Sequence, residues 1–253
     1  MPLPRFYLPT LSHHSQEAQL PAEEAQHLTR VLRLKAGDNI QVFDGHGLER
    51  EATITHDSDN LVSLSLGKPV SQSKESKVRI SIGVALLTGR KFDVIVRDAT
   101  MLGASEISPL LTLRSRQIKV THDNNRLIKR WQQIAVASTK QCGRSYLPVI
   151  SQPTQFHQYI EAHSDTVEQR ILLLEPSRHS LTNSPTSLQQ LASSSRPRTA
   201  SIAIGPEGGW TDEEIELAEN GAYAPVTLGT NTLRAESVPI VALSVLRFMW
   251  SDF

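Results

Sequence analysis

Two glycine-containing loops near the C-terminus carry the residues best suited to chemistry. The first has the sequence Gly-Pro-Glu-Gly-Gly at 205–209, after an apolar run that ends at Ile204 and before a helix start at Thr211. Glycine allows a backbone to approach a ligand closely. The loop lacks the Lys-Ser or Lys-Thr of a phosphate-binding loop, and its spacing differs from the GxGxxG dinucleotide pattern. It therefore favours a ligand that is not a polyphosphate, with a plain strand-to-helix turn as the alternative.

The second loop contains Gly229 and leads to Arg234 and Glu236, two residues apart. An apolar strand expected over Pro225–Leu228 precedes it, and a closing helix expected over Glu236–Trp250 follows it. Open α/β sheets bind ligands in the loops at the carboxyl ends of their strands, so two such loops predict a ligand site. An ion pair of Arg234 with Glu236 that caps the last helix is the structural alternative.

Charge is distributed unevenly along the chain, although 26 basic and 26 acidic residues cancel overall. Residues 1–72 hold 6 basic and 9 acidic side chains, a net of −3. Residues 73–151 hold 14 and 5, a net of +9, and residues 152–253 hold 6 and 12, a net of −6. A basic segment of this kind is typical of a surface that faces a polyanion such as nucleic acid. Acidic surfaces of the same protein or of a second subunit are the alternative partners.

Composition excludes several classes of protein. The 253 residues, of which 39% are hydrophobic and 21% charged, suit two globular domains. The N-terminus lacks the basic start and apolar run of a secretory signal, and no apolar stretch is long enough to span a bilayer. Cys142 is the single cysteine, which excludes an internal disulfide, and the nine histidines lack metal-ligand spacing. We therefore expect a cytoplasmic protein without a membrane span or a metal.

The first 72 residues predict a small β-barrel. Alternating apolar and polar residues predict strands over Asn39–Phe43, Glu49–Thr55 and Leu61–Leu66, and a short helix begins near Pro21. Short strands with one helix are typical of a small barrel. The polar stretch Ser71–Lys77 is the expected linker, so we place the domains at residues 1–72 and 73–253.

Strands alternate with helices after Val78, which predicts an α/β domain with a parallel sheet. We expect strands over 78–87, 106–111, 170–174, 199–204 and 225–228, and helices over 92–102 and 125–140. Thr211 and Glu214 have the spacing of a capping box that starts another helix. That helix is expected to end at Asn220-Gly221 with a left-handed stop.

Several motifs together resemble the RsmE family of SPOUT RNA methyltransferases, whose C-terminal domain is a trefoil knot. They are the loop at 205–209, Leu228-Gly229 and Leu233-Arg234-Ala235-Glu236-Ser237, with His27–Leu34, Gly37-Asp38, Gly89–Asp93, Leu102–Ala104, Ile107–Pro109 and Gln141–Arg144 upstream. The match covers essentially the whole chain in the right order. The chain departs from the family at Ala235–Val238, where Thr-Glu-Thr-Ala is usual, and at Met101, where a carboxylate is usual.

The resemblance implies a methyltransferase that uses S-adenosylmethionine to methylate N3 of a uridine in 16S ribosomal RNA. It also implies a PUA-like N-terminal β-barrel that binds RNA and a knotted parallel-sheet domain that binds the cofactor. A homodimer that acts on 16S rRNA or the small ribosomal subunit is implied as well. The implied cofactor-binding residues follow three strands of the second domain: Leu174, Ile204, Gly205, Pro206, Glu207, Gly208, Gly209, Leu228, Gly229 and Leu233.

Methyl transfer to uracil N3 requires loss of the N3 proton, and a nearby guanidinium can stabilise the resulting negative charge. We assign that role to Arg234, and we assign Glu236 to orienting Arg234 or accepting the proton through water. Cations of the basic segment and of the first domain are the candidates for RNA contact: Arg30, Arg33, Lys91, Arg114, Arg116, Lys119 and Arg144. For Arg30 and Arg33, an exposed helix face paired with Glu23 and Glu24 is the alternative.

Two other functions stay open at this point. One is a knotted methyltransferase that modifies a ribose 2′-hydroxyl or a transfer RNA, which the nucleoside product would distinguish. The other is a non-catalytic RNA-binding assembly protein with a vestigial cofactor pocket. The departures from the family pattern near Arg234 and at Met101 are the reason to consider it. Absence of S-adenosylmethionine binding would favour this second alternative.

Overall fold

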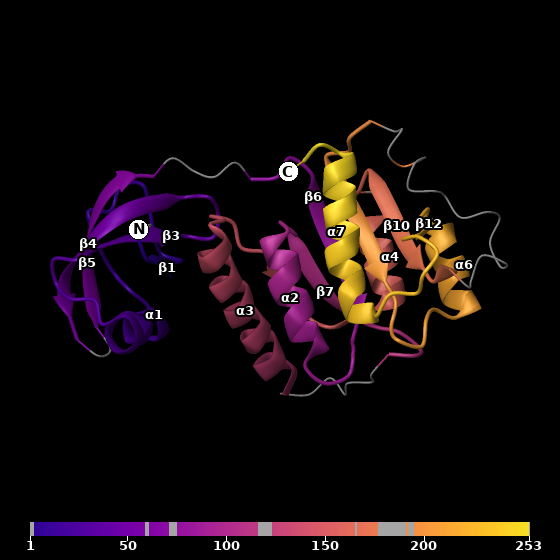
Figure 1. Ribbon diagram of the computed structural model, residues 1–253, viewed down its shortest axis with the longest axis horizontal. Coiled ribbons are helices and arrows are strands. Elements are labelled where there is room, and N and C mark those ends of the chain that lie inside the picture. The colour runs from indigo at the N-terminus through magenta and orange to yellow at the C-terminus, as the bar shows by residue number, and fades with distance from the viewer. Residues whose placement is uncertain are drawn as a thin grey trace. The chain divides into compact units, whose positions relative to one another are not determined.

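A computed structural model describes residues 3–58, 61–70, 75–115, 123–164, 166–176, 191 and 195–252 (Figure 1). The predicted RNA-binding residues Arg116 and Lys119 lie outside these ranges. The chain divides into two compact units, one made of Met1–Glu75 with Val136–Leu147 and the other of Ser76–Ala135 with Pro148–Phe253. The first unit therefore includes a segment far beyond the domain boundary expected at residue 72. Within the described ranges, no helix is both long and apolar enough to cross a membrane.

The first unit is built on a five-stranded sheet, as the alternating sequence predicts. Its strands are β1 Arg5–Tyr7, β2 Glu17–Gln19, β3 Asn39–Phe43, β4 Glu49–Asp57 and β5 Val62–Pro69, in the order β1-β3-β4-β5-β2. Neighbouring strands are antiparallel except β1, which runs parallel to β3. Apolar side chains from one face of these strands join those of α1 (Ala22–Gln26) and the π-helical turn η1 (His27–Leu32) in one buried core.

A buried arginine joins the distant segment to this sheet. The Arg5 guanidinium pairs with the Glu49 carboxylate through Nε–Oε1 and Nη2–Oε2 distances of 2.7 and 2.9 Å. Its Nη atoms also donate to the carbonyl oxygens of Thr139, Lys140 and Arg144 at 2.9, 3.2 and 2.7 Å. Thr139 and Lys140 lie in the last turn of α3 (Asp123–Cys142), where the final carbonyls have no helical partners. Arg5 thus caps a helix end that lies 134 residues further along the chain.

The second unit contains the parallel sheet that the sequence predicts. Its strands are β6 Arg79–Ala85, β7 Glu106–Leu111, β8 Val149–Ile150, β9 Thr154–Gln155, β10 Gln169–Leu174, β11 Thr199–Ile204 and β12 Ala224–Thr227. They lie in the order β12-β10-β11-β6-β7-β8, with β9 also paired to β7, and every pairing is parallel. Its central strands are buried on both faces, which explains their nearly continuous apolar sequences.

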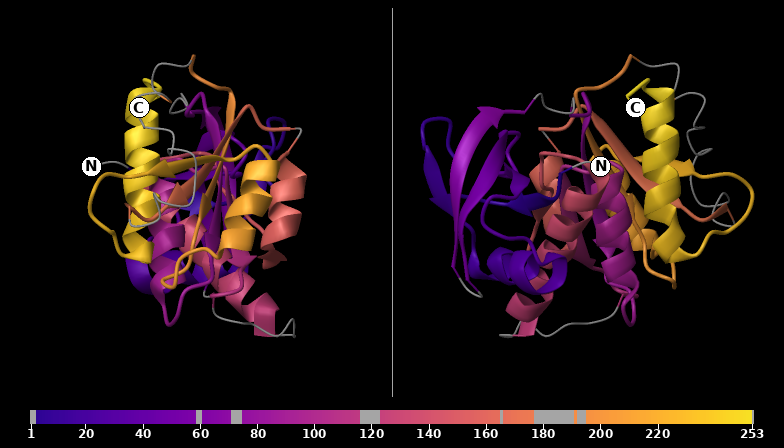
Figure 2. Two further views of the ribbon diagram at one scale, coloured as in Figure 1. Left: turned by 90° about the vertical axis from the view of Figure 1, so that its right-hand side faces the viewer. Right: turned by 60° about the vertical axis from the view of Figure 1, so that its left-hand side comes forward.

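Helices cover both faces of this sheet. One face packs against α2 (Lys91–Met101), the first part of α3 and α7 (Val238–Met249), and the other against α4 (Phe156–His163) and α6 (Asp212–Asn220). The left view of Figure 2 shows α7 on one side of the sheet and α4 and α6 on the other. The closing helix expected from Glu236 starts as a 3₁₀ turn, η3 Ala235–Ser237, and becomes α-helical at Val238. Pro239 is in the first turn of α7, where its missing N–H has no helical partner to lose.

A second buried arginine closes the C-terminal part of this unit. Arg247 in α7 donates to the carbonyl oxygens of Leu102 and Gly103, at the end of α2, and to the Asp252 carboxylate, each at 2.6 Å. The Asp252 carboxylate accepts the backbone N–H groups of Lys77 and Val78 at 2.6 and 3.0 Å. Arg247 and Asp252 therefore connect three parts of this unit: the end of α2, the segment that precedes β6 and the C-terminal turn.

The end of α6 differs from the expected left-handed stop at Gly221. Gly221 has a φ of −80°, and the left-handed residue is the next one, Ala222, with a φ of 58°. A side chain at Gly221 would collide with the Cγ2 atom of Ile160 in α4. The expectation was wrong because the close packing of α4 against α6, rather than the backbone conformation, requires glycine here.

Candidate functional site

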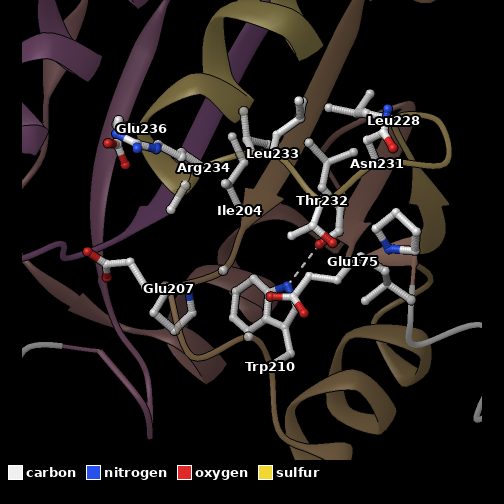
Figure 3. Close-up of a pocket in the computed structure, with 18 of the residues that line it drawn as sticks. Glu175, Ile204, Glu207, Trp210, Leu228, Asn231, Thr232, Leu233, Arg234 and Glu236 are labelled. Carbon is white, nitrogen blue, oxygen red and sulfur yellow. Dashed lines mark hydrogen bonds between the residues drawn. The ribbon is translucent and has the colours of Figure 1, made fainter.

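A cavity of about 360 Å³ lies at the carboxyl ends of β10, β11 and β12 (Figure 3). These strands are neighbours in the sheet, so the segments that follow them meet at one edge. The lining comes from those segments, the start of α2 and η3: Lys91, Leu173, Leu174, Glu175, Pro176, Ile204, Gly205, Pro206, Glu207, Gly209, Trp210, Leu228, Asn231, Thr232, Leu233, Arg234, Ala235, Glu236 and Val238. The two loops singled out in the sequence thus border one cavity.

Close packing explains the glycines of the first loop. The Trp210 indole is buried, donates from Nε1 to the Leu173 carbonyl oxygen at 3.0 Å and stacks on Phe156 with ring centroids 4.5 Å apart. A Cβ at Gly205 would approach that indole to 3.0 Å. Gly209 has a φ of +69°, and a Cβ there would lie 3.1 Å from Oε1 of Glu175. The loop therefore folds tightly around the tryptophan, and its residues Gly205, Pro206, Glu207 and Gly209 line the cavity.

The capping box at the start of α6 is confirmed, and it also secures a neighbouring loop. Thr211 Oγ1 accepts the Glu214 N–H at 3.3 Å, and Glu214 Oε2 accepts the Thr211 N–H at 3.0 Å. The other carboxylate oxygen of Glu214 accepts the Leu113 N–H, after β7, at 2.8 Å. Arg114 then donates to the Gly208 carbonyl oxygen at 3.0 Å. The segment after β7 thus holds the glycine loop in place.

One side of the cavity carries four charged side chains. Lys91 Nζ lies 2.9 Å from Oε1 of Glu207 and 3.6 Å from Oε2 of Glu236. The hydrogen bond to Glu207 raises the pKa of Lys91, so its ammonium stays charged. Burial pushes the pKa of Glu207 upward, but the hydrogen bond from Lys91 and backbone N–H groups bring it below its ordinary value. Arg234 is exposed and lies beside Glu207 and Glu236 on this side (Figure 3).

The Glu236 carboxylate lines the cavity, with its Oε2 atom buried. Its ion pair is with Lys91, and the distance of 3.6 Å is too long for a hydrogen bond. Among the described residues, no hydrogen-bond partner reaches this buried Oε2 atom. The structure thus places the Glu236 carboxylate at the cavity, between Lys91 and the Arg234 guanidinium.

Among the described residues, the other side of the cavity carries one charged side chain, Glu175. It is the first residue after β10 and is half-buried beside Trp210 and Thr232, away from Glu207 and Arg234 (Figure 3). Within the described part of the chain, its carboxylate has no hydrogen-bond or ion-pair partner. Sequence reasoning missed Glu175, although its position directly after an expected strand was a usable signal.

Most of the residues expected to bind the cofactor line the cavity, and two do not. Those in the lining are Leu174, Ile204, Gly205, Pro206, Glu207, Gly209, Leu228 and Leu233. Gly208 instead packs against Arg114, with 3.3 Å between its virtual Cβ and the Arg114 Cβ, and Gly229 supplies a φ of +102° for its turn. Besides Glu175, sequence reasoning missed these lining residues: Leu173, Pro176, Trp210, Asn231, Thr232, Ala235 and Val238.

The structure separates the candidates for RNA contact into different environments. Arg30 and Arg33 are exposed at the end of η1, whereas Glu24 forms its ion pair with Lys140 at 2.8 Å. Arg144 is largely buried and forms an ion pair with Glu75. Lys91 lines the cavity, as described above. In the described ranges, no group of three or more potential metal ligands comes together.

Family models match both parts of the chain. An RNA methyltransferase domain matches residues 74–247, and an RNA methyltransferase PUA domain matches residues 20–66. The ribosomal RNA small subunit methyltransferase E of Synechocystis is 35% identical over 225 residues, which cover 89% of this chain and 71% of that protein. Its counterpart in Bacillus subtilis is 26% identical over 96% of each chain.

Solved structures share the fold over nearly the whole length. A methyltransferase of Legionella pneumophila, solved in complex with S-adenosylmethionine, is 27% identical, covers 98% of each chain and has a TM-score of 0.88. A ribosomal RNA small subunit methyltransferase E from Neisseria gonorrhoeae is 24% identical over 98% of each chain, with a TM-score of 0.85. Both the N-terminal sheet and the parallel sheet therefore have the expected PUA-like and methyltransferase folds.

Proposed function

The chain belongs to the ribosomal RNA small subunit methyltransferase E (RsmE) family, and on that premise we propose that it methylates N3 of a uridine in 16S ribosomal RNA with S-adenosylmethionine as methyl donor. The observation that carries this proposal is the single cavity in which both glycine loops, Arg234 and Glu236 meet. The knotted threading expected for the second unit stays a prediction.

The cavity suits S-adenosylmethionine better than a nucleoside polyphosphate. Its volume falls within the range of about 300–1,000 Å³ common for small-molecule sites. Its lysine, Lys91, is already engaged by two carboxylates rather than exposed to a phosphate. The walls combine aliphatic side chains, Trp210 and residues of the glycine loop, which suit a nucleoside joined to an amino acid.

The cofactor, when bound, supplies an electrophilic methyl group on a sulfonium. The chain's own residues then have to hold uracil N3 in line with that methyl group and remove the N3 proton. Glu236 Oε2, buried and without a hydrogen bond among the described residues, is the proposed proton acceptor, directly or through water. Arg234 is the proposed stabiliser of the negative charge that spreads to the uracil oxygens as the proton leaves. The N3–methyl bond forms as the sulfur–methyl bond breaks.

RNA binding is proposed for the first unit, with Arg30 and Arg33 in contact with phosphates. Both are exposed at the end of η1, and Arg33 has the left-handed φ of 55° that ends this turn. Phosphate contacts release counterions, so binding should weaken steeply as salt rises. A salt dependence that is unchanged in the Arg30→Gln, Arg33→Gln double variant would refute this assignment. The contribution of Lys91, Arg114 and Arg144 to RNA contact stays a prediction, as does the cytoplasmic location.

A homodimer is proposed on the basis of apolar side chains exposed on α2 and α7. Phe248 is 77% exposed, Ile240 is 39% exposed and Met101 is 36% exposed, and α2 and α7 pack against each other. Exposed apolar side chains on adjoining helices favour a protein interface. Light scattering should give twice the chain mass for the wild type and the single chain mass for Phe248→Glu. The mass of one chain for the wild type would exclude the dimer.

The direct test is transfer of labelled methyl groups to hypomethylated small ribosomal subunits, followed by identification of the nucleoside by mass. We expect 3-methyluridine. Arg234→Ala should lower the rate at saturating cofactor and RNA by roughly 100- to 1,000-fold, as for loss of one charge-stabilising donor. Arg97→Ala, which removes an exposed arginine from α2 outside the cavity, is the matched control and should leave the rate unchanged. A ribose-methylated product would show that the methylated atom is not uridine N3. Full activity of the Arg234→Ala variant would show that Arg234 has no role in the mechanism.

A further inference from the structure

One ammonium group connects three elements beside the cavity. Lys91 is the first residue of α2, Glu207 lies in the glycine loop after β11, and Glu236 lies in η3. Lys91 Nζ is 2.9 Å from Oε1 of Glu207 and 3.6 Å from Oε2 of Glu236. All three side chains line the cavity. The arrangement of the two carboxylates therefore depends on where one lysine places its charge.

The start of a helix is an unfavourable place for a lysine. The N-terminal end of the helix dipole is positive, so it repels a cation in the first turn. Lys91 occupies that turn of α2, and its side chain is half-buried. The carboxylates of Glu207 and Glu236, rather than the helix, therefore account for the position of this ammonium.

The two carboxylates depend on Lys91 to different degrees. Glu207 also accepts a hydrogen bond from the Thr88 hydroxyl at 3.4 Å, and backbone N–H groups help to lower its pKa. Glu236 meets Lys91 by charge, at a distance too long for a hydrogen bond. Like charges repel each other at short range, and a cation between them offsets that repulsion. Loss of the ammonium should therefore displace Glu236 more than Glu207.

We propose that Lys91 is a positioning residue for the methyl transfer: its ammonium allows Glu207 and Glu236 to lie together and holds Glu236 in place as proton acceptor. This inference rests on the proposed function, in which Glu236 accepts the proton of uracil N3. Lys91 acts through Glu236 in this role. Its loss should therefore slow the transfer itself more than it weakens binding of the cofactor.

The first test separates the rate of transfer from binding. Lys91→Met should lower kcat at saturating cofactor and RNA by roughly 10- to 100-fold, because a small displacement of a reacting group is costly. Calorimetry should show a change of less than about threefold in the dissociation constant for S-adenosylmethionine, since Glu207 and its loop keep other contacts. Retained cofactor binding also shows that the variant is folded.

Two further variants serve as controls for the charge and for the helix. Lys91→Arg keeps a positive charge at the same place and should retain most of kcat. Arg97→Met removes a cation from an exposed position of the same helix, outside the cavity, and should leave kcat unchanged.

A second substitution distinguishes charge balance from a merely structural role. If Lys91 offsets the repulsion between the two carboxylates, removal of the charge of Glu207 should compensate for its loss. The double variant Lys91→Met, Glu207→Gln should thus be several-fold more active than Lys91→Met alone. In a structural role, the loss of two contacts would add, and the double variant would be the less active of the two.

A slow Lys91→Met variant that Glu207→Gln partly restores would support the inference. An unchanged kcat in Lys91→Met would overturn it, and a shallower salt dependence of RNA binding in that variant would then assign Lys91 to phosphate contact. A double variant less active than Lys91→Met would overturn it as well.

Failure of the proposed function gives different results. Full activity of Glu236→Gln would refute Glu236 as the proton acceptor, and with it this role of Lys91. A wild-type chain that makes no 3-methyluridine would refute the proposed function itself. If Glu236→Gln is slow while Lys91→Met keeps its rate, the inference fails and the proposed function stands.

Discussion

Arg5 in the first unit and Arg247 in the second perform the same task with different partners. Each guanidinium binds carbonyl oxygens where a helix ends, in the last turn of α3 for Arg5 and just after α2 for Arg247. Each also pairs with a carboxylate, Glu49 or Asp252. Helix ends leave carbonyls without partners, and a planar guanidinium can bind several of them at once.

The difference between the two pairs lies in exposure and in what the carboxylate does. The Arg247 and Asp252 side chains are each 2% exposed, and Asp252 holds backbone N–H groups before β6. The Arg5 side chain is 12% exposed and lies over the Phe43 ring, and its partner Glu49 accepts a hydrogen bond from the Ser145 hydroxyl. In the second unit, Arg247 and Asp252 therefore supply hydrogen-bond partners to buried backbone groups. In the first unit, Arg5 and Glu49 hold a segment that is distant in the sequence.

Removal of Arg247 should have the largest effect on stability. Arg247→Met leaves the Asp252 carboxylate and two helix-end carbonyls buried without their partner, which should cost about 3–5 kcal/mol. Hydrogen exchange should show lost protection in α2 and β6 and preserved protection in β3–β5. If the free energy of unfolding falls by less than about 1 kcal/mol, water replaces the guanidinium. Greater burial would then not make the Arg247–Asp252 pair the more important of the two.

Removal of Arg5 should have a smaller effect, confined to the first unit. Arg5→Met should cost about 2–4 kcal/mol, because the guanidinium is less buried and water can reach the freed groups more easily. Hydrogen exchange should increase at the end of α3 and in β4 and stay unchanged in β10 and β11. Equal deprotection of both units would contradict the independence of the two pairs.

Alkaline pH should affect the second unit through its buried tyrosines. Burial raises the pKa of Tyr223 to about 12, and burial raises the pKa of Tyr159 well above its ordinary value. Because the folded state holds these protons more tightly, their contribution is complete below pH 10 and is lost as pH rises toward 12. Tyr223→Phe should reduce this loss by about 1.4 kcal/mol per pH unit between pH 10 and 12. Denaturant titrations at a series of pH values would measure the slope, and parallel slopes for the two proteins would contradict it.

An exposed ion pair should show the smallest effect and serve as the baseline. Lys35 Nζ lies 3.7 Å from Asp57 Oδ2, and the lysine side chain is 78% exposed. Exposed pairs contribute little because solvent screens them and long side chains lose freedom. Lys35→Met should leave the melting temperature unchanged within error. If Lys35→Met lowers the melting temperature as much as Arg5→Met does, burial does not explain why the buried arginine pairs matter more than an exposed pair.

Local patterns predict the elements of the fold well. Alternation predicts β3 to β5, the Thr211–Glu214 spacing predicts the start of α6, and apolar runs followed by glycine predict the loops after β11 and β12. These signals depend on residues that are close in sequence. The pairs of Arg5 and Arg247 are not predictable in this way, because their partner carbonyls lie 134 to 145 residues away.

The sequence predicts which loops form the candidate site, but it does not predict where their charged side chains point. The residue types of the glycine loop indicated a ligand that is not a polyphosphate, and the cavity agrees with that. Lys91 was predicted to contact RNA from its place in the basic segment, and its position between two cavity carboxylates could not be read from the sequence. Its contact with RNA stays a prediction. Gly221 was interpreted from backbone preference, whereas its neighbour Ile160 comes from a different helix.

The inclusion of Val136–Leu147 in the first unit has a consequence for how such proteins can be recombined. Arg5 and Glu49 rely on groups contributed by Thr139, Arg144 and Ser145, so no uninterrupted stretch of the gene encodes the whole first unit. A single crossover that joins this N-terminal half to another enzyme separates the arginine from the helix end that it caps. Exchange of N-terminal units among such chains therefore requires either two junctions or a partner that brings a matching helix.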